Sequence, residues 1–262
     1  MISVLLTTYN WPEALSLCLQ SLQKQTDQNF EIIICDDGST KETQELVEQF
    51  QKESPVKISY LWQEDMGFRK TLILNKGIQA SAGNYLVFLD GDCITQSDFV
   101  EQHRKLAEKN FLVTGSRILC NQKLTQELCK KLNWNENIIK HHSLIWRLSF
   151  QINKLLPLFI KLPNHPFRKY SKFVWKRIKG CNMACWKSDA LSISGFDESL
   201  TGWGHEDADF VFRLQDYGIK RKSGAWATEV LHLWHKTMSK ENAAKNATIV
   251  REKIIAKSKK KS

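Results

Sequence analysis

The sequence predicts an α/β protein with a mixed, mainly parallel sheet flanked by helices. In residues 2–89, short apolar runs alternate with segments of helical periodicity, a rhythm typical of βαβ units. Polar clusters follow three of the apolar runs, at residues 7–10, 36–39 and 90–92. Ligands of open α/β sheets bind outside the carboxyl ends of the strands. The sequence therefore places a binding site at these three clusters.

The expected elements follow from local patterns of apolar residues, prolines and glycines. Pro12 suits a first helical turn, and Leu15, Leu19 and Leu22 continue it at helical spacing. Gly218 suits the end of a helix that begins near His205. Strands are expected at 2–6, 30–35, 56–62, 84–89, 111–119 and 180–186, and further helices at 40–51 and 70–80.

Bulk composition indicates a soluble globular protein. The 262 residues are 42% hydrophobic and 25% charged, and no apolar run reaches the ~18 residues that span a bilayer. The start of the chain lacks the basic region of a secretory signal, so a cytoplasmic protein is expected, peripheral at most on the inner face of the plasma membrane. The seven cysteines include no Cys-x-x-Cys pair, which favours reduced thiols over disulfides or a zinc site.

The formal charge of +10 is concentrated in one interval. No acidic residue lies between Glu136 and Asp189, whereas eleven lysines and arginines do. Apolar positions at Ile145, Leu148, Ile152, Leu155 and Phe159 suggest an amphipathic helix, which Pro157 and Pro163 interrupt. Basic residues recur every seventh position, at Lys140, Arg147, Lys154, Lys161 and Arg168.

Two interpretations of this basic segment stay open. It could bind an anionic membrane surface, or it could be a helical insertion packed on the sheet with a solvated basic face. Nucleic acid is not an expected partner, because no recognition motif accompanies the charge. The lysine-rich tail at 257–261 adds further basicity and is expected to be disordered.

The segment Asp90-Gly91-Asp92 is the first candidate for chemistry. Side chains at i and i+2 of a strand point the same way, so the two carboxylates converge after a buried strand. Like charges this close favour a divalent cation between them. Gly91 would let backbone or ligand approach closely. The alternative is an ordinary Asp-Gly turn.

A second group of candidates lies late in the chain. Gly202-Trp203-Gly204 directly precedes the acidic residues Glu206, Asp207 and Asp209. Acidic residues are also favoured at helix N-termini by the macrodipole, which is the structural alternative. His232 and His235 could be ordinary core or surface residues, or metal ligands.

Together these motifs resemble the family-2 glycosyltransferases of the GT-A fold. The resemblance rests on Thr-Thr-Tyr-Asn at 7–10, Asp-Asp-Gly-Ser at 36–39, Gly67 with Asn75, and Asp-Gly-Asp at 90–92. The segment 202–209 resembles the C-terminal half of galactosyltransferase-like and chondroitin-polymerase-like enzymes. The resemblance excludes about residues 121–179. It implies one domain with a nucleotide-sugar half (1–120), a basic amphipathic insertion (121–179), an acceptor and catalytic half (180–256) and a basic tail (257–262).

The resemblance also implies residue roles. Asp207 would be the general base, with Glu206, Trp203 and Gly204 shaping the acceptor site. Asp92 would ligate Mn²⁺ or Mg²⁺ together with His232 or His235. Many family members carry arginine where this chain has Leu74, a contact that Arg69 or Lys70 could replace. The donor nucleotide would be held by Thr7, Tyr9, Asp37, Asp65, Gly67, Arg69, Asn75, Asp90 and Gly91, with Asp90 on the ribose side.

The activity implied is an inverting, metal-dependent transfer of a hexose from a UDP-linked donor to a hydroxyl of a glycan or lipid-linked acceptor. Family context points to surface polysaccharide or lipopolysaccharide synthesis. A non-catalytic, membrane-associated carbohydrate-binding protein is one alternative. A nucleotidyltransferase is another, but residues 7–12 contain no Lys, Arg or Gly with which to build its usual phosphate loop.

Overall fold

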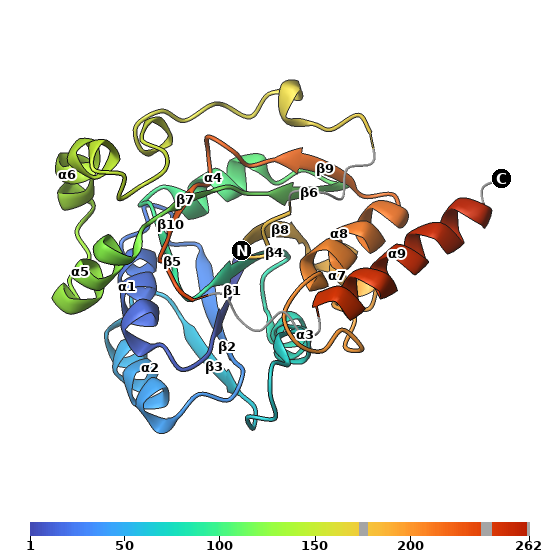
Figure 1. The fold of residues 1–262 in the computed structure, drawn as a ribbon, viewed down its shortest axis with the longest axis horizontal. Helices are drawn as coiled ribbons and strands as arrows, with labels where there is room; N and C mark the ends of the chain where they lie inside the picture. The colour runs from blue at the N-terminus through green and yellow to red at the C-terminus, as the bar shows by residue number, and fades with distance from the viewer. Residues whose placement is uncertain (173–177, 237–242, 261–262) are drawn as a thin grey trace.

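The computed structural model of the chain describes residues 1–172, 178–236 and 243–260. Among these residues, seven strands form the larger sheet in the order β3-β2-β1-β4-β8-β6-β9, and three form a smaller sheet in the order β5-β10-β7 (Figure 1). The strands are β1 (Ile2–Thr8), β2 (Phe30–Asp36), β3 (Ile58–Trp62), β4 (Tyr85–Asp90), β5 (Cys93–Thr95), β6 (Phe111–Thr114), β7 (Arg117–Leu119), β8 (Asn182–Trp186), β9 (Lys220–Ser223) and β10 (Val230–His232). The helices are α1 (Pro12–Gln23), α2 (Lys41–Glu53), α3 (Lys70–Ala80), α4 (Phe99–Leu106), α5 (Gln122–Lys131), α6 (Glu136–Leu148), α7 (Lys187–Ser192), α8 (Glu206–Asp216) and α9 (Ala243–Lys260).

The expected mixed, mainly parallel sheet is confirmed. Strands β1 to β4 pair in parallel, β8 runs antiparallel to β4 and β6, and β6 pairs in parallel with β9. Every residue of β1 and β2 is buried, as expected of central parallel strands covered on both faces. The register pairs Thr7 with Asp90 and Thr8 with Asp36, so the three polar clusters meet at one edge of the sheet.

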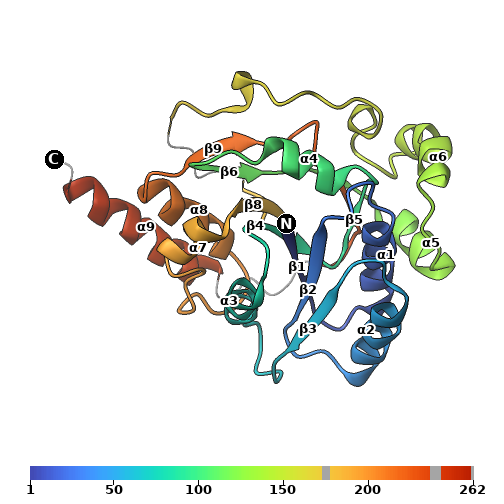
Figure 2. The same cartoon turned by 180° about the vertical axis from the view of Figure 1, so that it is seen from behind.

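Two hydrophobic layers cover the sheet. Leu15 and Leu19 of α1 and Val47 and Phe50 of α2 belong to one buried cluster, which α4 completes. Helices α3, α7 and α8 pack into a second cluster that contains Phe210. Figures 1 and 2 show α1 and α2 on one side of the sheet and α3, α7 and α8 on the other. Helix α8, which carries the late acidic residues, is therefore anchored on the sheet.

The single strand expected at 111–119 is wrong. The chain leaves the large sheet after Thr114 and enters the small sheet at Arg117. The Gly115 N–H donates to the Asn182 carbonyl at 2.8 Å, and a Cβ on Gly115 would lie 2.2 Å from the Asn182 side chain. The change of sheet thus depends on a close approach of β8, which is remote in sequence.

The amphipathic helix expected through Ile145 and Phe159 is also wrong. Helix α6 ends at Leu148, and Ile152 already forms a bridge with Cys120 beside the small sheet. From there to Lys172 the chain is irregular apart from 3₁₀ turns at Leu156–Leu158 and Pro166–Arg168 and a bridge between Lys169 and Lys222. The spacing of apolar residues continued past the end of the helix, so it did not describe one helical face.

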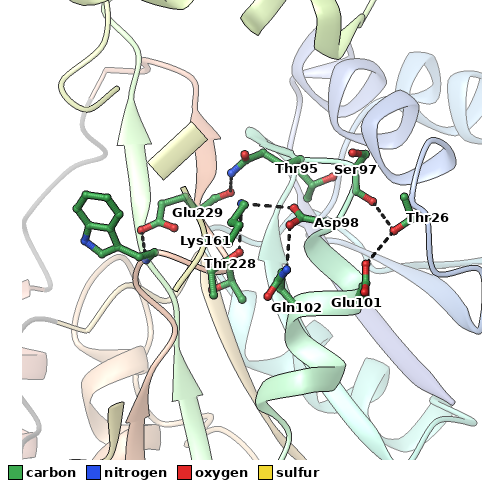
Figure 3. A network of polar contacts seen from close by, with 12 residues as sticks. Thr26, Thr95, Ser97, Asp98, Glu101, Gln102, Lys161, Thr228 and Glu229 are labelled. Carbon is green, nitrogen blue, oxygen red and sulfur yellow. Dashed lines mark hydrogen bonds and ion pairs between the residues drawn. The ribbon is translucent and has the colours of Figure 1, made fainter. Parts of the chain in front are cut away.

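Of the basic residues at sevenfold spacing, Lys140 and Arg147 lie within α6 and share a face, but the other three lie beyond the end of this helix. Lys154 donates to the Ser116 hydroxyl at 2.7 Å, and Lys161 lies 3.4 Å from the Asp98 carboxylate (Figure 3). Lys161 also donates to the Ala227 carbonyl at 3.3 Å. Arg168 is buried and donates to the carbonyls of Leu162, Pro163, Ser223 and Ala225. These contacts favour the packed interpretation for residues 151–170.

The structure also bears on the expectations for the cysteines, the lysine-rich tail and membrane-spanning segments. All seven cysteines are free, and six are buried, which confirms the reduced-thiol prediction. The tail expected to be disordered from Lys257 continues helix α9 as far as Lys260. In the part of the chain that the structure describes, no helix combines the length and apolar character needed to cross a bilayer.

Candidate functional site

The ends of β1 and β4 form the floor of the site. The Thr7 hydroxyl donates to Asp90 Oδ1 at 2.8 Å, and the Gly91 N–H donates to the Thr7 carbonyl at 2.7 Å. A Cβ on Gly91 would lie 2.9 Å from that carbonyl oxygen, so glycine is required by the approach of β1. The Asp90-Gly91-Asp92 segment is thereby fixed on the sheet rather than being a free turn.

Lys70, at the first position of α3, pairs with Asp90. Its Nζ lies 2.5 Å from Asp90 Oδ1. Burial acts to raise the pKa of Asp90, but the Lys70 ammonium and hydrogen bonds from Lys70 and Thr7 outweigh it, so the pKa lies below its usual range. Burial acts to lower the pKa of Lys70, but the charges of Asp90 and Glu206 raise it overall. Both groups are therefore held charged.

Asp92 points to a different set of partners. Its Oδ2 lies 3.7 Å from His232 Nε2 and 3.3 Å from His235 Nε2. One donor atom from each residue lies within 4.8 Å of the others, so the three could close around a single ion. Burial is the main cause that lowers the pKa of His232, which favours the neutral imidazole that a metal needs. The structure thus brings together Asp92 and both candidate histidines.

The turn that precedes α8 positions the late acidic residues. Gly202, Gly204 and His205 all have positive φ, at 73°, 111° and 70°, a conformation that glycine adopts without strain. The Gly204 N–H donates to Glu206 Oε2 at 3.1 Å. Burial, followed by the charge of Asp207, raises the pKa of Glu206. Glu206 therefore supports the turn and is harder to ionise than an exposed glutamate.

Asp207 contacts Gly180, the residue that directly follows the basic insertion (121–179). Its Oδ2 accepts the Gly180 N–H at 3.0 Å, and a Cβ on Gly180 would lie 3.0 Å from the Asp207 Cβ. Asp209, two residues later, is fully buried and is bound by Arg213 Nε at 2.6 Å and Lys253 Nζ at 2.7 Å. The acidic run therefore divides into site residues and a structural residue, Asp209.

The predicted nucleotide residues near β2 form a connected rim. Asp37 is buried and accepts the Gln63 side-chain amide at 2.6 Å and the Arg69 N–H at 2.7 Å, and burial is the main cause that raises its pKa. The Tyr9 hydroxyl donates to Asp65 Oδ2 at 2.8 Å, and this bond is the first cause that raises the pKa of Tyr9. Asp65 Oδ1 accepts the Gly67 N–H at 3.1 Å.

Two residues predicted to contact the nucleotide bind elsewhere in the fold. The Asn75 amide nitrogen donates to the Phe196 carbonyl and to Glu198, and its oxygen accepts the Phe196 N–H, so this side chain holds the turn at 195–198. Arg69 Nη2 donates to the Glu64 carbonyl. Leu74, where many family members have arginine, is buried. Lys70 is the cation that reaches Asp90.

One pocket joins the two halves of the site. Thr7, Lys70 and Asp90 line it from the first half, and Gly180, Glu206 and Asp207 from the second. Leu74, Phe88, Leu89, Met183 and Phe196 complete the lining. Sequence reasoning gave Lys70 no definite role and missed the Gly180 N–H. The only signal for either was indirect: a cation at a helix start, and a glycine ahead of a strand.

Comparison with known families matches both halves of the chain. The family model described as glycosyl transferase family 2 matches residues 3–163, and the N-terminal domain of galactosyltransferase matches residues 165–236. Among curated relatives, chondroitin synthase of Escherichia coli is 28% identical over 95% of this chain. Hyaluronan synthase of Pasteurella multocida is 29% identical over 97% of it. The chain spans 37% and 27% of the lengths of these two relatives.

Solved structures share the fold. GalNAc-T7 with UDP, GalNAc and Mn²⁺ matches with a TM-score of 0.64 at 15% identity, over 96% of this chain and 47% of that one. The mannosyltransferase PcManGT from Pyrobaculum calidifontis, in complex with GDP-Man and Mn²⁺, matches with a TM-score of 0.58 at 15% identity, over 88% and 56%. These likenesses confirm the GT-A fold. Because the family-2 model matches more than half of its residues, the chain belongs to glycosyl transferase family 2.

Proposed function

We propose that this chain transfers a hexose from a UDP-linked donor to a hydroxyl group of a glycan or lipid-linked acceptor, with inversion at the anomeric carbon. One observation carries the proposal. Asp90 and Asp207, from opposite halves of the chain, line the same pocket, and Asp92, two residues after Asp90, lies beside His232 and His235. A donor on one side and an acceptor on the other would meet in this pocket.

On the donor side, the rim of Tyr9, Asp37 and Asp65 would bind the nucleotide, and Thr7 and Asp90 would lie beneath the ribose. Asp92, His232 and His235 would hold a divalent ion, since a carboxylate with two neutral imidazoles is a mixed O/N set that suits Mn²⁺. When bound, that ion supplies positive charge to the departing diphosphate, a contribution of several kcal/mol.

On the acceptor side, Asp207 would act as the general base. The Gly180 N–H fixes one carboxylate oxygen of Asp207, which lies in the first turn of α8. Asp207 would take the proton from the acceptor hydroxyl as it attacks the face opposite the nucleotide, a contribution of ~10²–10⁴-fold. Trp203, 36% exposed, offers an aromatic surface to a sugar ring.

The relatives support a carbohydrate acceptor. Chondroitin synthase and hyaluronan synthase are named for polysaccharides, and validoxylamine A glucosyltransferase of Streptomyces hygroscopicus, 27% identical over 88% of this chain and 56% of its own length, is named for transfer to a small molecule. We therefore propose polysaccharide or lipopolysaccharide synthesis as the setting.

The test measures the transfer of hexose from UDP-hexoses to glycan acceptors in the presence of Mn²⁺. Its readouts are the release of product and the anomeric configuration of that product. The Asp207→Asn variant should lose about 10²–10⁴-fold in turnover. The Glu252→Gln variant, which changes an exposed carboxylate on α9, is the matched control and should behave as wild type. Full activity of Asp207→Asn would refute the assigned base. Formation of pyrophosphate from UTP and a sugar phosphate would instead identify a nucleotidyltransferase.

A further inference from the structure

Helix α6 exposes an apolar face to solvent. Ile138, Leu144, Ile145 and Leu148 are 39%, 56%, 61% and 70% exposed. At 100° per residue these positions gather on one side of the helix. The opposite side carries Ile139, Ser143 and Trp146, which are buried against the small sheet and α5. Packing within the described chain thus explains one apolar face of α6 and leaves the other uncovered.

The end of α6 adds an unusual residue to this face. The Gln151 N–H donates to the Trp146 carbonyl and the Phe150 N–H to the Arg147 carbonyl, the two bonds of a Schellman motif. Phe150 occupies the position where glycine is normal, with φ 56°, and its side chain is 81% exposed. A bulky side chain is unfavourable in the left-handed region. Fold stability therefore does not account for phenylalanine here.

Exposed apolar side chains also occur in and after the 3₁₀ turn at Leu156–Leu158. Leu156, Phe159 and Ile160 are 54%, 52% and 47% exposed. We call these three residues, the four exposed residues of α6 and Phe150 the apolar patch. In Figures 1 and 2, α5 and α6 lie at the end of the molecule opposite α9, so the helix that carries half of the patch is at one extremity of the fold. A helix whose apolar face is exposed can lie in a membrane interface with that face buried.

The charge around the patch favours an anionic partner. Residues 122–150 contain five basic residues against two glutamates, namely Lys123, Lys130, Lys131, Lys140 and Arg147 against Glu127 and Glu136. Lys140 pairs with Glu136 at 3.1 Å, which leaves the other four basic side chains in excess. Lys123, Lys130 and Lys131 are exposed on α5. Beyond Glu136, no acidic residue follows until Asp189. Large apolar side chains bordered by lysine and arginine are the composition of interfacial membrane elements.

We propose that the apolar patch inserts into the headgroup region of an anionic lipid bilayer, with the exposed lysines of α5 and Arg147 of α6 on the lipid phosphates. Within residues 151–170, the side chains of Lys154, Lys161 and Arg168 bind within the fold. The membrane contact is made by α6, Phe150 and the turn at 156–160. The inference does not depend on the transferase chemistry.

The experiment is sedimentation of the full chain with vesicles of phosphatidylglycerol and phosphatidylcholine, at low and high salt. Wild type should bind the anionic vesicles at low salt, more weakly at high salt, and phosphatidylcholine alone much less. Phe150→Gly should weaken binding about tenfold, since a large apolar side chain is lost from the lipid, while the melting temperature stays equal or rises. Leu148→Ala should also weaken binding.

Controls separate this inference from its rivals. Ile255→Ala, which removes a 49% exposed side chain from α9, should bind as wild type. Asp92→Asn should also bind as wild type, so loss of transfer does not imply loss of binding. No binding at low salt, or unchanged binding by both Phe150→Gly and Leu148→Ala, would overturn the proposal. Light scattering could instead show that wild type forms a concentration-dependent dimer and that both variants stay monomeric. This result would assign the patch to a protein interface.

Discussion

Lys253 of α9 joins α8 to the turn at 195–198 and offers a test of how the C-terminal part of the fold is held. Its Nζ lies 2.5 Å from Asp197 Oδ2 and 2.7 Å from Asp209 Oδ1. Burial acts to raise the pKa of Asp197, but hydrogen bonds from Lys253 and Ser199 outweigh it and lower the pKa to about 2. A shift from the ordinary 3.8 corresponds to about 2.4 kcal/mol of stability at neutral pH.

Lys253→Met should remove part of that stabilisation. Ser199 also contributes, and the Lys253 and Asp197 side chains are 29% and 26% exposed to screening solvent, so the expected loss is ~1–2 kcal/mol. Asp209 keeps its pair with Arg213. Lys245→Met, at an exposed position of the same helix, is the matched control and should change stability little.

The pH dependence gives the sharper result. Since the folded pKa of Asp197 is lowered, its stabilisation is complete above the unfolded pKa near 4 and is lost as the pH falls through about 2. Urea unfolding should show the Lys253→Met loss at pH 7, with about half of it remaining at pH 3. A loss that is unchanged or larger at pH 3, or an equal loss in Lys245→Met, would refute the reasoning.

Three other substitutions or titrations probe the site and its supports. Asn75→Ala should lower the unfolding free energy by ~2 kcal/mol in urea, since it loses the bonds to the turn at 195–198, and leave UDP affinity nearly unchanged. Weaker UDP binding without lost stability would restore Asn75 to the nucleotide site. Gly91→Ala should cost ~1–3 kcal/mol, because its Cβ meets the Thr7 carbonyl; an unaltered urea midpoint would contradict this. Burial lowers the pKa of His103 to about 3, so its NMR signals should remain those of a neutral ring at pH 5. Protonation near pH 6.5 would show that the ring is not buried as described.

Local patterns predicted the parts of the fold that depend on nearby residues. The apolar runs of β1, β2 and β4 and the polar residues after them were enough to place Asp37, Asp90 and Asp92 at one sheet edge, because parallel strands end together. The carboxylates of Asp90 and Asp92 diverge, however. Asp90 pairs with Lys70 and Asp92 faces His232 and His235, a division that depends on α3 and β10.

Each of the wrong predictions has its own physical cause. The break in 111–119 depends on Asn182, which meets Gly115 from β8, far along the chain. Apolar spacing from Ile145 to Phe159 fits one helix, but the left-handed Phe150 ends it. Periodicity also cannot distinguish a face buried in the fold from one left in solvent, and α6 has both.

Separating donor binding from chemistry tests the central claim most directly. Calorimetric titration of UDP with Mn²⁺ should be compared with the transfer rate in wild type, Asp92→Asn and Asp207→Asn. Asp92→Asn should lose the Mn²⁺-dependent part of UDP binding and also transfer, because Asp92 is assigned to the metal set. Asp207→Asn should bind UDP as wild type and lose transfer alone, because Asp207 is proposed as the base on the acceptor side of the pocket. Mn²⁺-dependent UDP binding and transfer that survive in Asp92→Asn would contradict the account.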